Sequence, residues 1–514
     1  MPHFDVLILG AGSAGSVLAN RLSAEAQRTV CVLEAGGMPT DPDIDDPLQW
    51  PFIQGRAYDW AFETVPQPGT AGRVHPWPRG KVFGGSSCLH AMAHVRGHRD
   101  DFAVWAEATA SARWSYEGLL PSFIAMEDFS GEASAYHGKG GPLAVWKPAE
   151  EVSPVAEAYM RAGQEIGAPA LGDHNGEHLN GVAANSLTIR NGKRVSAAQA
   201  YLFPALARPN LTVQGGATVH RLIIEGRRVT GVAVTIDGQD LVYSADAVIL
   251  AAGAVADPLL LMRSGVGDPV VLAEAGVDCI LSRPEVGKNL HDHLLGSGNA
   301  YRARRPVPLS RLQHSESLMY LNAEDPSIAT GRPDVVLGCV IGPSASECLP
   351  ALAPGEAYTL LFGVTHPTSR GALRITGPEI ADAPVIDPAY LQTENDRRLF
   401  RRALDYARMV GHAKAMDEWR AEEVQPGSKP MSETEKDAFI AKAVITHHHP
   451  VGTCRMGADD AAVVDADLKL NGLDNLYIVD ASVIPAITSG PVHAAVLAIA
   501  ETFAAAWPSI SSAQ

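Results

Sequence analysis

Aromatic side chains and cysteines are both scarce in this sequence. Aromatic residues make up 6% of the 514 positions, and the six cysteines are scattered without a Cys-x-x-Cys pair or any metal-ligand spacing. This pattern excludes a cysteine metal site and predicts six free thiols, most of them buried. Glycine (48) and proline (36) are abundant instead, which is typical of a loop-rich enzyme and excludes a fibrous protein.

Long apolar runs and basic charge are lacking too. No stretch of about 18 consecutive apolar residues occurs, so we expect no transmembrane segment and no membrane partner. The 41 lysines and arginines are outnumbered by 58 aspartates and glutamates, which gives a formal net charge of −17. Nucleic acids bind basic patches, so a nucleic-acid partner is excluded as well. The first residues lead into a strand-like run without the pattern of a signal peptide, which favours a cytoplasmic protein.

The sequence opens with a pattern typical of nucleotide binding. An apolar run of strand length leads into Gly10-x-Gly12-x-x-Gly15, a helical pattern follows, and a second apolar run ends at Glu34. In a strand–turn–helix unit, the three glycines allow the tight turn, the approach of a pyrophosphate, and close packing of helix on strand. Glu34 can accept hydrogen bonds from ribose hydroxyls, which disfavours a 2′-phosphate. The alternative is a glycine turn in an unrelated α/β protein.

The rest of the chain predicts two kinds of sheet. Residues 247–253 and 476–482 are apolar runs typical of buried parallel strands that return to the first sheet, whereas 239–243 reads as a separate short strand. Residues 300–345 and 358–390 alternate between apolar and polar positions, which indicates a mostly antiparallel sheet. We therefore expect a cofactor fold built from separated pieces and interrupted by a second domain.

A glycine-rich segment at residues 79–97 is a second candidate for ligand contact. It holds a glycine pair and two serines before an apolar stretch, so its main chain could lie close against a flat ligand. The alternative is a tight turn that leads into a buried helix.

The densest reactive stretch is the run of His447, His448 and His449. In an extended segment only His447 and His449 would share a face, and two ligands without a nearby acid make a poor metal site. We therefore expect no metal; a surface histidine run is a further alternative. Imidazole suits proton removal near neutral pH, and deprotonation of an alcohol turns its carbon into a hydride donor for a flavin. His493 opens the last predicted helix, whose N-terminus disfavours a charged imidazole.

Several motifs, taken together, resemble the glucose–methanol–choline (GMC) family of flavin oxidoreductases over essentially the whole chain. Besides the opening glycines, they are GKVFGGSSCLHAMAHVRG (80–97), HGKGGPL (137–143), RPNL (208–211), LAAGAVADPLLLMRSGVG (250–267), PEVGKNLHDH (284–293), SRG (369–371), HPVGTCRMG (449–457) and VDASVIP (479–485). The resemblance implies FAD rather than NAD. It also implies an α/β bilobal fold, in which a Rossmann-like FAD-binding domain is interleaved with a substrate-binding domain built on a mixed or antiparallel sheet.

The resemblance also divides the chain. It implies that residues 1–150, 207–296 and 440–514 form the discontinuous FAD-binding domain, and that 151–206 and 297–439 form the substrate-binding domain. By position, His449 and His493 match the two catalytic residues of the family. The cofactor-binding positions that the resemblance implies are Gly10, Gly12, Ser13, Ala14, Gly15, Glu34, Ala35, Gly80, Val82, Gly85, His90, Ala91, Met92, Ala93, Val219, Asp480, Ala481, Val492 and His493.

Three positions depart from the family pattern. His90 stands where asparagine is usual, and Asp257 replaces a serine or threonine. Leu89 stands where some relatives carry a histidine bound covalently to the flavin, so we expect non-covalent FAD.

Within the family, the His447-x-His449 and Pro491-Val492-His493 arrangements most resemble members that oxidise pyridoxine, a pyridine with hydroxymethyl groups. This resemblance implies that His447 and the Pro491 carbonyl bind a small aromatic or heteroaromatic alcohol. We expect an alcohol oxidase that uses O2 and yields H2O2, acting as a monomer or small homo-oligomer. The alternatives are a choline-like or aryl-alcohol dehydrogenase with another electron acceptor, and a lyase with an idle flavin.

Overall fold

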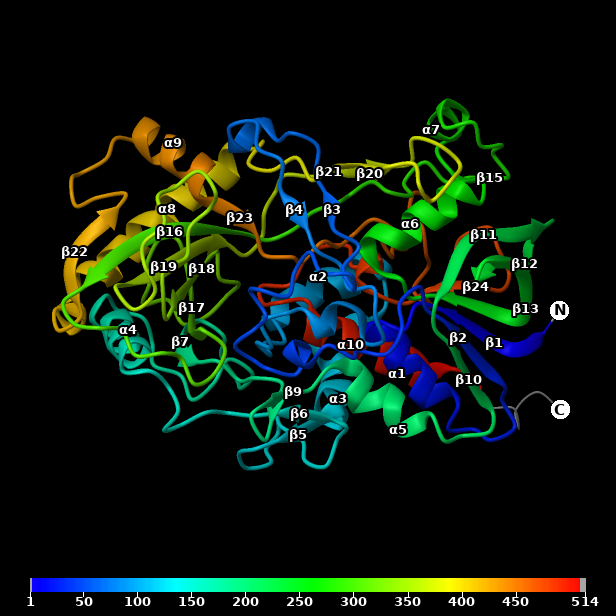
Figure 1. Cartoon of the computed structure of the whole chain (residues 1–514), viewed down its shortest axis with the longest axis horizontal. Coiled ribbons are helices and arrows are strands. Elements are labelled where there is room, and N and C mark those ends of the chain that lie inside the picture. Colours follow the sequence, from blue (N-terminus) through cyan, green and yellow to red (C-terminus); the bar gives the residue numbers. More distant parts are fainter. Residues whose placement is uncertain (1, 509–514) are drawn as a thin grey trace.

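Two lobes, each built on one large sheet, make up the protein (Figure 1). The computed structural model describes residues 2–508. The first lobe, on the right of Figure 1, holds the N-terminal strand and its sheet, whereas the second lobe holds the other sheet and helices α8 (Glu394–His412) and α9 (Glu433–Ala443). Helices α2 (Arg99–Thr109) and α10 (His493–Ala506) lie between the two sheets.

The first sheet has the strand order β10-β2-β1-β13-β12-β11, and β24 pairs with β13. Its parallel core confirms the expected Rossmann-like α/β arrangement, because apolar runs buried on both faces favour parallel pairing. The separate strands expected at 239–243 and 247–253 are one continuous strand. The strands are β1 (His3–Leu9), β2 (Val30–Leu33), β10 (Leu211–Gln214), β11 (Ala217–Glu225), β12 (Arg228–Ile236), β13 (Gln239–Leu250) and β24 (Leu476–Ile478).

Helices cover the first sheet. Helix α1 (Ser13–Leu22) begins directly after the glycine turn and packs against α10, which also contacts α3 (Tyr116–Met126). Helix α6 (Gly253–Arg263) follows β13 and contacts β11. The helices α1 and α6 thus both begin at the carboxyl ends of central parallel strands, where α/β sheets bind ligands.

The second sheet has the order β22-β16-β19-β18-β17-β7, with β23 paired to β16, and all its pairs are antiparallel as expected. Helix α4 (Pro154–Glu165) and helix α8 pack on it, and the Ser153 side chain caps α4 by accepting from the Val155 N–H. The strands are β7 (Gly181–Ala184), β16 (Leu294–Ala303), β17 (Ser315–Leu321), β18 (Val335–Val340), β19 (Ala357–Val364), β22 (Arg420–Gln425) and β23 (Val444–Thr446).

The chain passes between the lobes more than once. Strand β23 and the start of β16 pair in the second sheet, although residues 294–296 and 444–446 fall within segments assigned from sequence to the FAD-binding domain. The domain boundaries stay a prediction. The smaller elements are β3 (Phe62–Glu63), β4 (Pro76–Trp77), β5 (Glu127–Phe129), β6 (Leu143–Val145), β8 (Ile189–Arg190), β9 (Lys193–Arg194), α5 (Phe203–Ala205), β14 (Val266–Gly267), α7 (Pro269–Glu274), β15 (Leu281–Ser282), β20 (Ala372–Arg374) and β21 (Val385–Asp387).

Two expectations about the chain as a whole can be compared with this fold. All six cysteines are free, and four of them are buried, as predicted. None of the helices within residues 2–508 is long and apolar enough to cross a membrane.

Candidate active site

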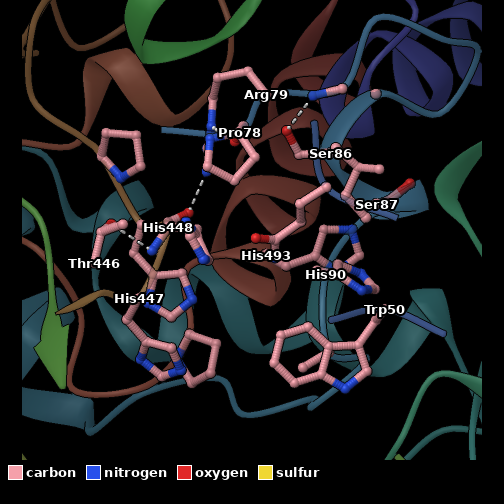
Figure 2. A pocket seen from close by; sticks show the side chains of 18 of the residues that line it. Trp50, Pro78, Arg79, Ser86, Ser87, His90, Thr446, His447, His448 and His493 are labelled. Atoms are coloured by element: carbon pink, nitrogen blue, oxygen red, sulfur yellow. Dashed lines mark hydrogen bonds between the residues drawn. The ribbon is translucent and has the colours of Figure 1, made fainter. Parts of the chain in front are cut away.

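A cavity of about 1010 Å³ joins the glycine turn of the first lobe to the histidine segment that follows β23. Its volume lies at the upper end of the range for ligand pockets, so it has room for a large cofactor and a small substrate. Figure 2 shows His447 and His448 on one side of the pocket and His90 and His493 on the other. The cavity therefore brings the two sequence motifs with the strongest chemical signals into one site.

The glycine turn forms the first end of the cavity. Gly10 has a φ of +104°, and a Cβ on Gly15 would lie 1.9 Å from the Gly10 carbonyl oxygen, so both glycines are required sterically. The Glu34 carboxylate accepts from the N–H groups of Ala11 and Gly36 at 2.8 and 2.9 Å, and thereby holds the turn. The N-cap residue of helix α1 is Gly12, so the helix has no capping side chain, and its first turn holds no acidic residue. Its N-terminal N–H groups are therefore available to a phosphate.

The segment 80–93 packs its main chain against this turn. A Cβ on Gly85 would lie 2.8 Å from the Gly12 Cα atom, and one on Gly80 would lie 2.2 Å from the Gly85 carbonyl carbon. The only helical piece here is the short turn Gly85–Cys88, so the alternative of a turn into a buried helix is wrong. The main chain of this segment therefore packs closely on the glycine turn, and its approach to a flat ligand stays a prediction.

His90 lies beside the cavity with a defined proton position. Its Nδ1 atom accepts from the Met92 N–H and from the Arg194 guanidinium, both at 3.0 Å, so the ring proton of the neutral form is on Nε2. That Nε2 atom is buried and has no partner among residues 2–508, and the ring lies edge-on to His493 at 4.7 Å. Sequence reasoning missed the buried Arg194, which no local motif marks.

These observations fit a bound FAD. The uncapped helix start and the glycine backbone suit a pyrophosphate, Glu34 suits a ribose, and the unpartnered Nε2–H of His90 suits an acceptor atom of a flat ring. Among the predicted positions, only Gly15 and Val82 do not line the cavity: Gly15 packs on Gly10, and Val82 packs with Ile44 and Cys88. The roles of the lining positions stay predictions.

The histidine segment forms the other end of the cavity, and its backbone is not extended as expected. His448 has a φ of +64°, because its N–H donates to the Thr446 hydroxyl and its carbonyl accepts from Arg79 (Figure 2). His447 and His449 nevertheless lie on the same side of the segment, as expected, since their ring centroids are 4.3 Å apart. The left-handed conformation of His448 turns the chain, so that the imidazoles of His447 and His449 both line the cavity.

Two residues of the His-Asp-His sequence at 291–293 hold this segment in place. The Asp292 carboxylate accepts from the His449 N–H at 2.7 Å and from the hydroxyls of Thr446 and Tyr390, both at 2.6 Å. The Nδ1 atom of His293 lies 3.0 Å from the Nδ1 atom of His449. Sequence reasoning gave neither residue a role; the available signal was a cluster of titratable residues directly before β16.

The expectation that no metal binds was based on two histidines, and the structure places a third histidine beside them. One nitrogen each of His293, His447 and His449 lies within 4.8 Å of the others. However, the 3.0 Å contact between His293 and His449 is a hydrogen-bond distance, which requires a proton where a metal would need two lone pairs. The absence of a metal stays a prediction.

Burial keeps the histidines of the cavity neutral. It lowers the pKa of His293 to about 4 and that of His493 to about 3, and it holds the pKa of His447 and His449 well below the usual value. For His493, which begins α10 as expected, burial is the largest cause, followed by the positive charges of neighbouring groups. Neutral imidazoles with a free nitrogen can accept protons from a substrate.

Acid is therefore expected to destabilise the fold. Buried histidines with lowered pKa values, including His291 and His448 at about 3, bind protons in the unfolded chain but not in the folded one below about pH 6.5. Stability should consequently fall as the pH falls, by up to about 1.4 kcal/mol per pH unit for each such histidine. Urea unfolding between pH 7.5 and 5 checks this, and stability that is constant or rises toward pH 5 would contradict it.

The sequence also matches family profiles in two parts. Profiles described as GMC oxidoreductase match residues 4–295 and 367–500, which together cover most of the chain. The chain belongs to the GMC oxidoreductase family. GMC oxidoreductases are FAD-dependent, which agrees with the fit of the cavity, and the two-lobed α/β fold is that of the family.

Individual GMC proteins are similar over nearly the whole chain. The chain is 54% identical to pyridoxine 4-oxidase of Microbacterium luteolum, over 98% of this chain and 99% of that protein. Mitochondrial choline dehydrogenase of Mus musculus is 35% identical, over 97% and 88% of the two chains. A crystal structure of pyridoxine 4-oxidase from Mesorbium loti superposes with a TM-score of 0.97 at 53% identity, covering 98% of this chain and 99% of that one.

Proposed function

We propose that this GMC oxidoreductase is an alcohol oxidase that converts the hydroxymethyl group of pyridoxine to an aldehyde and passes the electrons to O2, giving H2O2. The observation that carries the proposal is the neutral His449 in the same cavity as the glycine turn and the uncapped start of α1. The 54% identity to pyridoxine 4-oxidase supports the choice of substrate. We further propose that it acts in the cytoplasm, as a monomer or a small homo-oligomer.

In this proposal, His449 is the general base. Its ring is neutral because it is buried, and its Nε2 atom makes no hydrogen bond within the described chain, so it can take the hydroxyl proton. His493, on the opposite side of the pocket beside His90, assists. Bound FAD supplies the acceptor for the hydride that leaves the carbinol carbon. We infer that FAD is held non-covalently, because Leu89 stands where some relatives carry the histidine linked to the flavin.

His447 and the Pro491 carbonyl would select the pyridine ring. Both line the cavity, and the His447 ring lies 4.3 Å from that of His449, so a substrate hydroxymethyl group at the base would place its ring near His447. Imidazole and carbonyl groups suit the ring nitrogen and phenolic oxygen of pyridoxine. A substrate without those groups would leave them unpaired, at a cost of about 1–3 kcal/mol each.

Replacing His447 with alanine is expected to weaken the binding of pyridoxine more than that of benzyl alcohol. Pyridoxine should lose about 10-fold or more in kcat/KM because it alone uses the hydrogen bond. Parallel steady-state kinetics on both alcohols measure the difference. Equal losses for the two substrates would show that His447 does not recognise the ring.

Choline-type substrates are the second candidate, because several relatives are choline dehydrogenases. A quaternary ammonium ion is bound through an anion or an aromatic cage. Within the described residues, the cavity is lined by only two carboxylates, Glu34 and Asp480, and these accept from the N–H groups of Ala11 and Gly253 at the glycine-turn end. The histidine end therefore lacks a carboxylate counter-ion for choline, so an aromatic lining residue such as Trp50 would have to hold the ammonium group.

Oxygen consumption tests the proposed acceptor. With pyridoxine in air, the purified protein should consume one O2 and form one H2O2 for each aldehyde. Aldehyde formation that requires an added quinone or dye, without O2 uptake, would make it a dehydrogenase instead.

A further inference from the structure

A row of hydrogen bonds leads from a main-chain carbonyl to the proposed base. The Nε2 atom of His293 lies 2.8 Å from the Thr365 carbonyl oxygen, and its Nδ1 atom lies 3.0 Å from Nδ1 of His449. The two rings meet edge to face at 5.2 Å and 81°. His293 is 4% exposed, so water does not compete for these bonds.

The chemistry of these atoms fixes every proton in the row. A carbonyl oxygen only accepts, so His293 must carry its proton on Nε2 and donate it to Thr365. Since burial keeps His293 neutral, its Nδ1 atom holds a lone pair and accepts. His449 must then carry its own proton on Nδ1, which leaves the lone pair of its neutral ring on Nε2.

We propose that His293 is a positioning residue that sets the tautomer of His449, so that the basic nitrogen of His449 is the one left free for the substrate hydroxyl. This rests on the proposed role of His449 as base. In the other tautomer, Nε2 would carry a proton and could not accept one. His293 thus acts through His449.

The main chain makes this arrangement rigid. Residues Leu294–Gly296 of β16 pair with β23, and the N–H of His447 donates to the His293 carbonyl at 2.9 Å. Asp292 holds the His449 N–H at 2.7 Å. The backbone carbonyl of His293 and the backbone N–H of His449 are therefore both held by hydrogen bonds next to the contact between the two rings.

Three substitutions at His293 separate tautomer control from simple packing. His293→Leu removes the acceptor, whereas an asparagine oxygen in His293→Asn can take the place of Nδ1. We expect His293→Leu to slow anaerobic flavin reduction by pyridoxine about 10- to 100-fold, with FAD content and KM nearly unchanged. His293→Asn should recover the rate to within about 3-fold of the wild-type protein.

His293→Asp gives a readout that packing alone would not change. A carboxylate facing Nδ1 of His449 favours the imidazolium, so the pKa of His449 should rise. The rate of flavin reduction should therefore fall at acidic pH, and its pH profile should shift upward by about one unit or more, with a high rate restored at alkaline pH. A buried histidine outside the cavity is the matched control: His174 donates to the Leu318 carbonyl at 3.1 Å, so His174→Leu loses the same kind of bond.

The results of these experiments distinguish a failure of the positioning role of His293 from a failure of the role of His449 as base. Wild-type rates in His293→Leu, equal losses in His293→Leu and His293→Asn, or an unshifted profile in His293→Asp would each overturn the positioning role. If His449→Ala itself left flavin reduction unchanged, the role of His449 as base would fail instead. A large loss in His449→Ala together with wild-type behaviour of the His293 variants would overturn the positioning role alone.

Discussion

Replacement of His449 by alanine is expected to slow flavin reduction by pyridoxine about 100-fold or more, which is typical of the loss of a general base. The ring is buried and neutral, and its two neighbours that touch it, His293 and His447, are neutral imidazoles as well. No carboxylate within residues 2–508 forms a hydrogen bond with the ring of His449, so its removal leaves no carboxylate in its place to take the proton. Anaerobic stopped-flow absorbance of the flavin measures the rate.

The adjacent histidine provides the control for this variant. His448 has a left-handed backbone, which asparagine tolerates, so His448→Asn should keep the turn. Both variants should retain FAD, because neither residue belongs to the glycine turn. Equal slowing in His448→Asn and His449→Ala would contradict a specific role for His449, and so would an unchanged rate in His449→Ala.

Replacement of Gly15 by alanine is expected to cost about 3 kcal/mol or more of stability and to abolish FAD retention. The new Cβ would lie 1.9 Å from the Gly10 carbonyl oxygen, which is main chain and cannot rotate away. Helix α1 would have to move off β1, and its N-terminus would leave the position at which it faces the cavity. Urea unfolding and the flavin-to-protein absorbance ratio measure the two effects.

Gly37 is the matched control for this substitution. A Cβ added there would meet no atom within 4 Å, and its φ lies outside the left-handed range. Gly37→Ala should therefore keep wild-type stability and flavin content. A stable, FAD-loaded Gly15→Ala protein would contradict the argument that close packing of α1 on the turn builds the cofactor end of the cavity.

Sequence patterns among residues close together in the chain were sufficient to predict the local secondary structure. The strand, glycine turn and helix at the start of the chain follow from the local spacing of the glycines, and Gly15 is required by the carbonyl oxygen of Gly10, only a few residues away. The atoms that exclude a Cβ on Gly10, in contrast, belong to the distant Ala251 and Ala252. Helix α4 was likewise predictable from Ser153 and Pro154, a cap and a first-turn proline. The alternating pattern predicted an antiparallel second sheet, but it carries no information on strand order, so the place of β22 and β23 beside β16 could not be foreseen.

Contacts between distant residues limited the prediction of the site. His293 and His449 are 156 positions apart and meet only because β16 pairs with β23. The left-handed backbone of His448 depends on Arg79, which lies 369 positions away. The residues proposed to bind substrate and cofactor could therefore be named from their chemistry. The residues that hold them, Asp292 and His293 beside His449 and Arg194 beside His90, became apparent only in three dimensions.

Anaerobic mixing of the purified holoenzyme with pyridoxine, benzyl alcohol and choline, each alone, tests the central claim most directly. The account predicts that pyridoxine bleaches the flavin absorbance fastest, that choline does not bleach it, and that admission of air restores the colour with formation of H2O2. Bleaching by choline but not by pyridoxine would contradict the proposed substrate, and absence of reoxidation in air would contradict the proposed oxidase activity.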